Sequence, residues 1–392
     1  MTIFTQEAPI LVTCPKDMPE YLKAELEGLG FARTHALDAG VETYGTLNDC
    51  MRLNLWVRTG HRVLFELKRF RAFDADELYR EIKALPWEEF IARDGYFRVD
   101  ASIRDTTVND SRFAGLRVKD AVADRFMDKY NERPDSGPET NGVCLFLHWR
   151  ENQATIYLDT TGDPLPRRGY RKRPHTAPMQ ETLAAACILA SGWPELAKTG
   201  SHFIAPMCGA GTLAIEAALM AMNGAPGLLR DNFAFMQVLG FDPETWDGML
   251  AEAEDAENPE IKGRIIATDH DPEAVDAARD NARLAGVGDF IEFEVCDFSE
   301  TDIPDGPGLI MLNPEYGQRL GDLDKLEEVY KSIGDFFKQR CGGKTGFIFT
   351  GNSDLAKRVG LRTKSRRIFW NAKIECRLLE YELYEGTKKQ RS

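Results

Sequence analysis

The C-terminal half of the chain alternates short apolar segments with longer helix-like ones, and this pattern limits the possible folds more than any other feature. From Ala177 onward, apolar segments of strand length occur at 202–207, 263–269, 291–297, 308–313, 343–350 and 374–384. Strands that alternate with helices predict a parallel, doubly wound sheet of the α/β class. The last apolar segments are closely spaced, which favours an antiparallel edge.

The N-terminal part has a different rhythm. Residues 11–31 predict a short strand, a turn and an amphipathic helix, and residues 41–70 predict strands around a second helix. Residues 75–159 predict a helix, a strand, a second helix and then two strands. The next stretch is rich in Pro, Gly and Arg, which is typical of a connection. We therefore expect two α+β pieces at 1–70 and 71–160, a basic linker at 161–176 and an α/β domain at 177–392.

Composition narrows the protein class. Hydrophobic residues make up 43% and charged residues 29% of the 392, as in ordinary globular proteins. The N-terminus lacks the features of a signal peptide, and no apolar run approaches the ~18 residues that span a bilayer. The eight cysteines form no C-x-x-C pair, which argues against zinc. We expect a cytoplasmic protein that binds neither a membrane nor a metal, and the sequence leaves the oligomeric state open.

The net charge of −14 argues against a protein that coats nucleic acid through its overall charge. Two basic islands nevertheless stand out, and neither contains an acid. The first, within 166–175, contains Arg167, Arg168, Arg171, Lys172 and Arg173. The second, within 355–374, contains Lys357, Arg358, Arg362, Lys364, Arg366, Arg367 and Lys373. A charge run is usually a solvated face, so neither island alone indicates a function.

A glycine-rich turn follows the first apolar strand of the α/β half and opens a helix, in the sequence APMCGAGTLAIEAA. Glycines there let the backbone approach a ligand closely. The residues that we expect at this ligand are Pro206, Cys208, Gly209, Gly211 and Thr212. Taken alone, the turn fits any nucleotide-binding crossover, including that of a dehydrogenase.

Two acids end the next two apolar strands. Asp269 at the tip of the second strand can accept both hydroxyls of a ribose, and Asp297 after the third can accept a hydrogen bond from an adenine amino group. Asp269 comes 60 residues after Gly209, so the intervening segment, with its aromatic residues Phe233, Phe235 and Trp246, must be an insertion. Either acid alone could also be a helix cap or a turn residue.

The most specific motif is Asn-Pro-Glu-Tyr, which directly follows the fourth apolar strand. The Asn313 side-chain oxygen and the Pro314 carbonyl could accept hydrogen bonds from an exocyclic amine and direct its lone pair toward a methyl donor. Tyr316 could stack on the base that carries the amine. Such groups act by positioning and electrostatics.

With these motifs in this order, residues 165–386 resemble the class I methyltransferases that form N2-methylguanosine in RNA. Residues from about 50 to 160 resemble a THUMP domain preceded by a ferredoxin-like piece. The best match is the bacterial 23S rRNA guanine-N2 methyltransferase family. The matching segments are CPKDMPEYLKAELEGLG, RRGYR, APMQETLAAACILASGW, PMCGAGTLAIEAALMA, GAPGL, DPEAVDAARDNARLAG, NPEYGQRLG and ECRLLEYEL.

This resemblance implies a Rossmann-like catalytic domain, S-adenosylmethionine as cofactor and RNA, most often rRNA, as partner. It also implies catalysis by Asn313, Pro314 and Tyr316, with Asn313 contacting the cofactor as well. The first basic island is expected to grip RNA phosphates.

The chain departs from the family pattern at two positions. Ala205 replaces an acid expected to bind the cofactor's amino group, and Glu315 replaces a second proline. If the Glu315 carboxylate faced the pocket, it could accept hydrogen bonds from the N1–H and N2–H edge of guanine; otherwise it points to solvent or caps a turn. The alternatives are an adenine-N6 methyltransferase, a tRNA guanine-N2 methyltransferase and an RNA-binding protein with an inactive methyltransferase domain.

Overall fold

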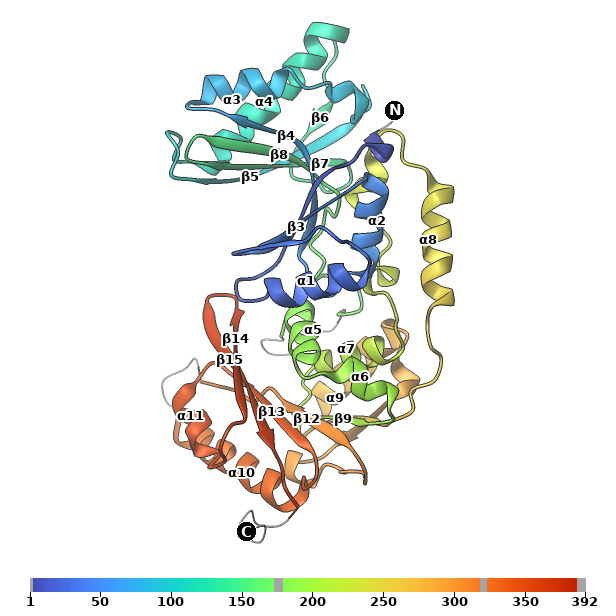
Figure 1. The fold of residues 1–392 in the computed structure, drawn as a ribbon, viewed down its shortest axis with the longest axis vertical. Coiled ribbons are helices and arrows are strands. Elements are labelled where there is room, and N and C mark those ends of the chain that lie inside the picture. Colours follow the sequence, from blue (N-terminus) through green and yellow to red (C-terminus); the bar gives the residue numbers. More distant parts are fainter. Residues whose placement is uncertain (1–2, 173–178, 318–322, 386–392) are drawn as a thin grey trace. The chain divides into compact units, whose positions relative to one another are not determined.

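The computed structural model describes residues 3–172, 179–317 and 323–385, which Figure 1 shows as a ribbon. The chain divides into two compact units. Unit 1 comprises Met1–Pro15, Leu22–Leu165 and Arg230–Ala253, and unit 2 comprises Lys16–Tyr21, Pro166–Leu229 and Glu254–Ser392. Among the described residues, no helix has both the length and the apolar surface needed to cross a bilayer.

Unit 1 is built on an eight-stranded sheet with the strand order β2-β3-β1-β4-β8-β7-β5-β6. Neighbouring strands are antiparallel, except that β5 runs parallel to β6 and β7. The strands are β1 (Ala8–Thr13), β2 (His35–Leu37), β3 (Gly40–Gly45), β4 (Arg62–Arg71), β5 (Tyr96–Arg104), β6 (Asp135–Ser136), β7 (Val143–Arg150) and β8 (Gln153–Asp159). The α+β character predicted for this part is confirmed.

Local signals set the helix ends of unit 1. A capping box between Thr46 and Asp49 starts α2, and Asn131, with a φ of +56°, ends α4 in the left-handed conformation. The helices are α1 (Pro19–Gly28), which begins in unit 2, α2 (Leu47–Trp56), α3 (Ala75–Lys83), α4 (Ser111–Tyr130) and α8 (Pro243–Asp255), with 3-10 turns η1 (Ile3–Thr5), η2 (Trp87–Glu89) and η4 (Ala234–Gln237).

The insertion after the glycine-rich turn contributes to unit 1. The rings of Phe233 and Phe235 stack with centroids 5.2 Å apart, and Trp246 meets Phe235 edge-on at 5.0 Å. The backbone N–H of Phe235 donates to the carbonyl of Thr160 at 3.0 Å. Arg230–Ala253 therefore packs with unit 1, although its sequence neighbours belong to unit 2.

Unit 2 contains a seven-stranded sheet with the order β11-β10-β9-β12-β13-β15-β14. The five strands from β11 to β13 are parallel, whereas β15 is antiparallel to both β13 and β14. The strands are β9 (His202–Pro206), β10 (Ile265–Asp269), β11 (Ile291–Val295), β12 (Gly308–Leu312), β13 (Thr345–Thr350), β14 (Ser365–Asn371) and β15 (Ile374–Glu382). This confirms the predicted doubly wound sheet with an antiparallel edge.

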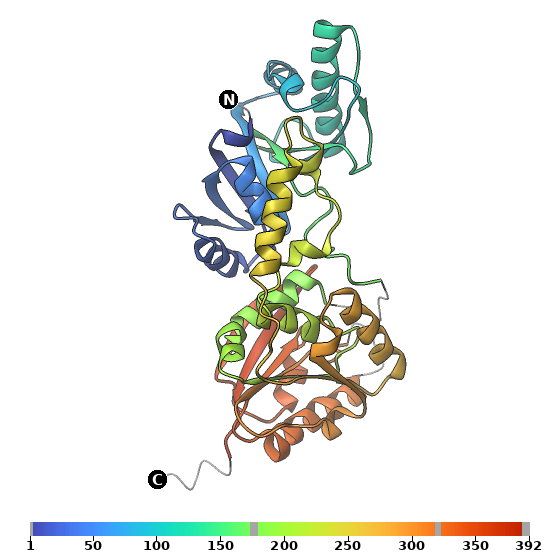
Figure 2. The ribbon, with the colours of Figure 1, turned by 90° about the vertical axis from the view of Figure 1, so that its right-hand side faces the viewer.

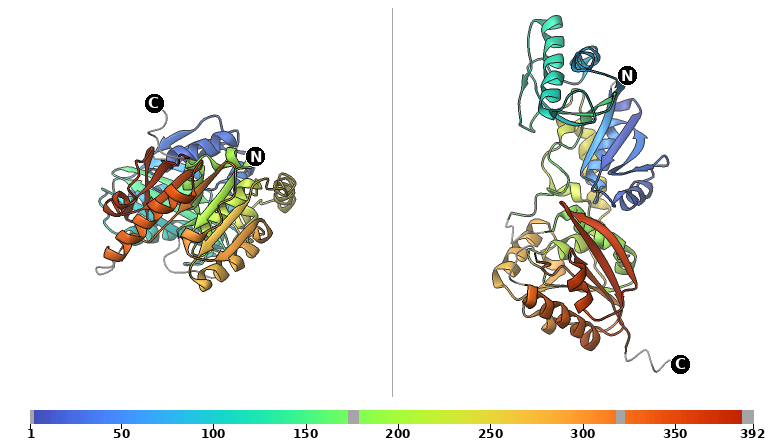
Figure 3. Two further views of the ribbon diagram at one scale, coloured as in Figure 1. Left: turned by 90° about the horizontal axis from the view of Figure 1, so that it is seen from below. Right: turned by 90° about the vertical axis from the view of Figure 1, so that its left-hand side faces the viewer.

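Strand β14 was not among the strands that the sequence predicts, because its residues lie in the second basic island. It pairs with β15 along its whole length. The right-hand view of Figure 3 shows the two as a red hairpin at the edge of the sheet.

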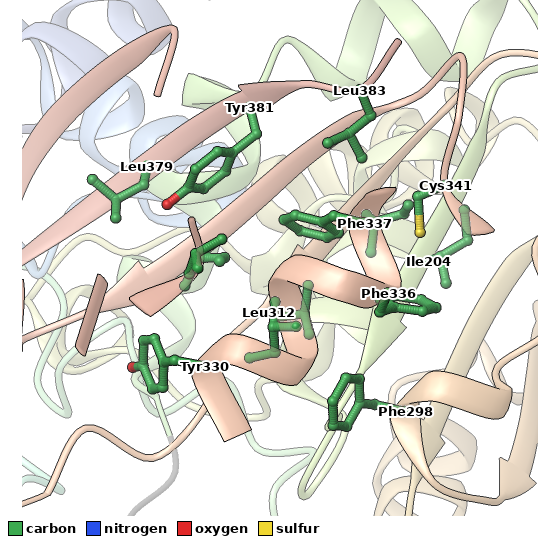
Figure 4. Packing of buried hydrophobic residues seen from close by; sticks show 14 of the residues in the cluster. Ile204, Phe298, Leu312, Tyr330, Phe336, Phe337, Cys341, Leu379, Tyr381 and Leu383 are labelled. Carbon is green, nitrogen blue, oxygen red and sulfur yellow. The ribbon is translucent and has the colours of Figure 1, made fainter. Parts of the chain in front are cut away.

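Helices cover both faces of the unit 2 sheet, as Figures 1 and 2 show. One layer contains α5 (Glu181–Ala190), α6 (Trp193–Lys198), α7 (Thr212–Ala221) and α9 (Pro272–Leu284), and the other contains α10 (Leu323–Arg340) and α11 (Ser353–Arg358). Short 3-10 turns occur at η3 (Pro226–Leu229), η5 (Gly288–Phe290) and η6 (Phe298–Glu300). Phe336 and Phe337 of α10 pack with Leu312 of β12 and Tyr381 of β15 (Figure 4).

The strand order places a reversal at β9, which pairs with β10 on one side and β12 on the other. Because these strands are parallel, the segments that follow them emerge at the same edge of the sheet. In doubly wound sheets, ligands bind in the crevice at such a reversal. The glycine-rich turn follows β9 and Asn313 follows β12, so this edge is the candidate site.

Candidate active site

The glycine-rich turn after β9 has an unusual backbone. Met207, Gly209 and Gly211 have φ angles of +58°, +53° and +84°. A left-handed conformation at a residue other than glycine costs roughly 1–2 kcal/mol, and such strain is concentrated at functional sites. The N–H of Cys208 donates to the Thr268 carbonyl of β10 at 2.9 Å, so the turn is held against the neighbouring strand.

The two glycines of the turn have different surroundings. A Cβ atom on Gly211 would lie 2.9 Å from the Cβ of Ala278 in α9, so this glycine permits close packing between α7 and α9. Around a Cβ atom on Gly209, the described residues place no atom within 4 Å. Gly209 therefore presents bare backbone to open space, where a ligand can approach.

These surroundings predict different defects in two alanine variants. Gly211→Ala should lower the free energy of unfolding by about 2–4 kcal/mol, because left-handed strain adds to overpacking. Gly209→Ala should lose only the strain contribution of about 1–2 kcal/mol, yet weaken binding of the expected cofactor. Thermal unfolding and calorimetric titration of both variants measure the two effects. Equal stability losses with equal cofactor affinities would contradict the distinction.

Asp269 ends β10 and contacts the glycine-rich turn directly. Its Oδ2 accepts a hydrogen bond from the N–H of Gly209 at 2.9 Å, and its Oδ1 accepts one from the N–H of Asp271 at 3.1 Å. The side chain is buried. Each carboxylate oxygen keeps a further lone pair, so Asp269 is a fixed acceptor beside the open space at Gly209.

The other residues expected at the cofactor differ in accessibility. Pro206 is buried, and burial raises the pKa of the half-buried Cys208 thiol above its usual range. The Thr212 hydroxyl is buried and accepts a hydrogen bond from Arg171 at 2.9 Å. Asp297 is exposed, and its Oδ1 accepts hydrogen bonds from the N–H and hydroxyl of Ser299 at 2.9 and 2.5 Å. Its contact with an adenine therefore stays a prediction.

Asn313 directly follows β12, on the other side of the strand-order reversal. Its Oδ1 is fully buried and has no hydrogen-bond partner among the described residues. A buried acceptor without a donor costs about 1–3 kcal/mol. The next residue, Pro314, is buried as well. An N–H group brought into this edge of the sheet would satisfy the Asn313 oxygen.

Tyr316 is held by two segments that sequence reasoning did not connect to it. Its hydroxyl accepts a hydrogen bond from Asn371 Nδ2 at 2.8 Å, and its carbonyl accepts one from Asn352 Nδ2 at 3.4 Å. A Cβ atom on Gly351 would lie 3.0 Å from its ring. Partial burial raises the Tyr316 pKa. Asn371 ends β14, 55 residues away, and no local pattern could have linked the two.

The expected RNA-binding role of Arg168 does not fit its position. Arg168 is 1% exposed, and its guanidinium forms a two-pronged ion pair with Glu216 of α7, with N–O distances of 2.8 and 3.2 Å. The Tyr170 hydroxyl donates to the same carboxylate at 3.1 Å. A guanidinium enclosed in this way has no surface to offer a phosphate, so Arg168 is corrected to a structural residue.

The rest of the first basic island is divided. Arg171 contacts Glu181 at 3.3 Å and is mostly buried, whereas Arg167 and Lys172 are exposed. Arg173 lies outside the described residues. The expected linker is thus not a free connection where it is described, because Pro166 already begins unit 2.

The two departures from the family pattern are also placed. Ala205 is buried within β9, and Glu315 is exposed. Exposure is what the solvent-facing alternative for Glu315 predicts. Among the described residues, no group of three or more His, Cys, Asp or Glu side chains could hold a metal ion.

Comparison with known proteins agrees with this organisation. A family model described as RMKL-like methyltransferase domain matches residues 168–380, a THUMP domain model matches 72–159, and a model of the RlmL ferredoxin-like domain matches 9–64. "Ribosomal RNA large subunit methyltransferase K/L" of Syntrophotalea carbinolica is 41% identical over 97% of this chain and 54% of its own length. The chain thus spans about half the length of the K/L relatives it matches.

Other relatives match over nearly their whole length. "Putative RNA methyltransferase slr0064" of Synechocystis is 35% identical over 96% of this chain and 97% of its own length. The structure of "SMU.472, a putative methyltransferase complexed with SAH" matches with a TM-score of 0.87 at 26% identity over 98% and 100% of the two chains. A "predicted N6-adenine-specific DNA methylase" from Listeria monocytogenes matches with a TM-score of 0.85 at 28% identity over 97% of both chains.

Proposed function

Because this chain belongs to the RMKL-like methyltransferase family with THUMP and RlmL ferredoxin-like domains, we propose that it methylates the exocyclic N2 of a guanine in 23S rRNA, with S-adenosylmethionine as donor. The name of the Syntrophotalea relative supports rRNA as the substrate class. The three matching family models confirm the predicted resemblance of this chain to that family. The nucleotide and the RNA class are part of the proposal.

The observation that carries the proposal is the unsatisfied Asn313 oxygen at the strand-order reversal. An exocyclic amine has two N–H groups, and its lone pair is delocalised into the ring. Acceptance of these hydrogens by Asn313 Oδ1 and the Pro314 carbonyl would turn the lone pair toward the methyl group. The buried oxygen would gain its missing donor in the same step, which favours the bound amine over solvent.

The residues around Gly209 fit the cofactor. The open space at Gly209 admits a ligand against bare backbone, and the fixed Asp269 carboxylate offers two acceptors for ribose hydroxyls. When bound, S-adenosylmethionine supplies an electrophilic methyl group on a sulfonium. The chain's own residues then need only to orient the amine, because its proton becomes acidic once nitrogen has gained the methyl group and can pass to water.

Tyr316 would stack on the extruded base. RNA helices hide their base edges, so a flipped or looped guanine is the natural substrate geometry. The bond from Asn371 to its hydroxyl keeps the Tyr316 ring from turning away, and the bond from Asn352 to its carbonyl holds the backbone. We also propose that the THUMP region and the exposed Arg167 and Lys172 bind RNA away from the reacting base, and that the protein works in the cytoplasm.

Adenine-N6 methylation is the alternative with specific support. Asn-Pro-x-Tyr serves an adenine amine equally well, and the Listeria neighbour's name refers to that activity. In the deciding experiment, the purified chain and S-adenosylmethionine are incubated with rRNA and tRNA from a strain that lacks the gene for this protein. Mass spectrometry of the nucleosides should show N2-methylguanosine in 23S rRNA. N6-methyladenosine, or methylated tRNA alone, would replace the proposal, and no product with intact cofactor binding would favour an inactive domain.

Asp269→Ala should weaken S-adenosylhomocysteine binding by about 10- to 100-fold for each ribose hydrogen bond lost, because a charged acceptor contributes roughly 1.5–3 kcal/mol per hydrogen bond. The variant also frees the N–H of Gly209, so calorimetry should be paired with a thermal unfolding curve. Asp289→Ala is a matched control, since Asp289 is exposed and is not among the residues expected at the cofactor. Unchanged affinity in a folded Asp269 variant would remove this residue from the site.

A further inference from the structure

The second basic island contains side chains that the proposed active site does not use. Four of its seven are ion-paired, at N–O distances of 2.8–3.5 Å: Lys357 with Asp354, Arg358 with Glu327, and both Lys364 and Arg367 with Glu380. The other three are Arg362, Arg366 and Lys373, and the described part of the chain places no carboxylate within ion-pair distance of them. Arg366 Nε instead donates to the Thr363 hydroxyl at 2.9 Å.

Two of these three cations lie on the hairpin β14–β15, together with one exposed and one half-buried apolar side chain. Alternate residues of a strand share one face, so Arg366, Ile368 and Trp370 of β14 lie on the same face. Ile368 is 45% exposed. Lys373 is exposed in the short turn that joins β14 to β15. We call Arg366, Ile368, Trp370 and Lys373 the hairpin stripe.

The turn of the hairpin lies beside the proposed target base. Asn371, the last residue of β14, donates the hydrogen bond at 2.8 Å to the Tyr316 hydroxyl. Trp370 comes directly before Asn371 in the sequence, and Lys373 comes two residues after it. Because neighbouring residues of a strand point to opposite faces, Asn371 and Tyr316 lie on the face of β14 opposite to Arg366, Ile368 and Trp370. A strand that leaves the base would reach the stripe over the hairpin turn at Lys373.

The local charge around the stripe is positive in an acidic chain. The ammonium of Lys16 lies over the Trp370 ring at 5.2 Å, and Asp17 accepts the indole N–H at 2.6 Å. On β15, Glu375 lies opposite Trp370 and is ion-paired with Arg377 at 3.1 Å. The residues around the stripe thus include four cations and two acids: Lys16, Arg366, Lys373 and Arg377, with Asp17 and Glu375. The whole chain, in contrast, carries a net charge of −14.

We propose that the hairpin stripe binds the single-stranded RNA that flanks the target nucleotide. Phosphates would contact Arg366 and Lys373, while unstacked bases would lie on Ile368 and on the open part of Trp370. Single-strand binding sites combine cations that follow the backbone with apolar or aromatic platforms for bases. This inference rests on the proposed function, since it places the flanking strand beside a base held at Tyr316.

The test is the double variant Arg366→Ala/Lys373→Ala in the full chain, titrated with fluorescein-labelled oligouridylate at several salt concentrations. The dissociation constant should rise about tenfold. The dependence of log Kd on log salt should flatten by roughly 1.4, because each phosphate contact on a single strand contributes about 0.7. Ile368→Glu, at an exposed position, should weaken binding further by repelling phosphates.

The control is Lys331→Ala/Lys338→Ala on α10, which removes the same charge from exposed positions in unit 2 and should leave oligouridylate affinity unchanged. Equal affinity of the stripe variant and the wild type would overturn the inference, even if the wild type methylates RNA. Loss of affinity confined to the stripe variants would support it. If the wild type then methylates no RNA, the proposed function fails while the RNA-binding surface stands.

Discussion

Asn313→Ala is expected to reduce kcat for methyl transfer by about 10²- to 10³-fold and to weaken S-adenosylhomocysteine binding much less, by the single contact that Asn313 is expected to make with the cofactor. Removal of one preorganised hydrogen-bonding group that acts on the reacting centre has effects of this size. In the free protein the buried Asn313 oxygen lacks a hydrogen-bond donor, which lowers the free energy of unfolding. Removal of this oxygen should therefore leave stability unchanged or slightly higher. Single-turnover kinetics, calorimetry and thermal unfolding measure the three quantities.

Two companion variants separate orientation of the amine from a general disturbance of the site. Asn313→Asp keeps an acceptor oxygen in place and should recover part of the lost rate. Tyr316→Ala should lower turnover less than Asn313→Ala does, because stacking on a base contributes roughly 1–3 kcal/mol. A wild-type rate in Asn313→Ala would sink the proposed mechanism.

The α/β half was predictable because each of its signals is local. Apolar runs such as β9 and β12 are buried on both faces of a parallel sheet, so they appear as short hydrophobic segments. The position of Asp269 followed from the same reasoning, since the tips of parallel strands meet at one edge. The structure places its carboxylate 2.9 Å from the N–H of Gly209, across 60 residues of sequence.

What the sequence did not predict depends on partners that lie far away along the chain. Strand β14 looks like a charge run, because Arg367 is paired with Glu380 only across the hairpin. Tyr316 is oriented by Asn371, 55 residues later. The aromatic insertion gave no sign that it would pack with unit 1.

The first basic island shows most clearly what a local sequence pattern cannot predict. A sequence window shows Arg168 among other cations, and such a run is usually solvated. The neutralising carboxylate, Glu216, lies 48 residues later on the apolar helix α7. Burial of a charge is expensive unless it is paired, so the fold must supply both members together. Local charge patterns cannot reveal that pairing.

Arg168→Ala is therefore expected to destabilise unit 2 by about 3–5 kcal/mol, because it leaves the fully buried Glu216 carboxylate without its countercharge. The Tyr170 hydroxyl alone, at 3.1 Å, cannot compensate for a lost two-pronged ion pair. For a unit of about 200 residues, such a loss lowers the melting temperature by roughly 10 °C. Differential scanning fluorimetry at one protein concentration and pH measures the shift.

The neighbouring Arg167 provides the matched control, since its side chain is exposed and Arg167→Ala should change stability by no more than about 0.5 kcal/mol. The double variant Arg168→Met/Glu216→Leu should be more stable than Arg168→Ala, because replacement of a whole buried ion pair by apolar side chains is often nearly neutral. If Arg168 instead gripped RNA, Arg168→Ala would keep the wild-type melting temperature and bind RNA more weakly, with a flatter salt dependence. That outcome would reverse the structural assignment of Arg168 and restore the whole first basic island to the RNA-binding surface.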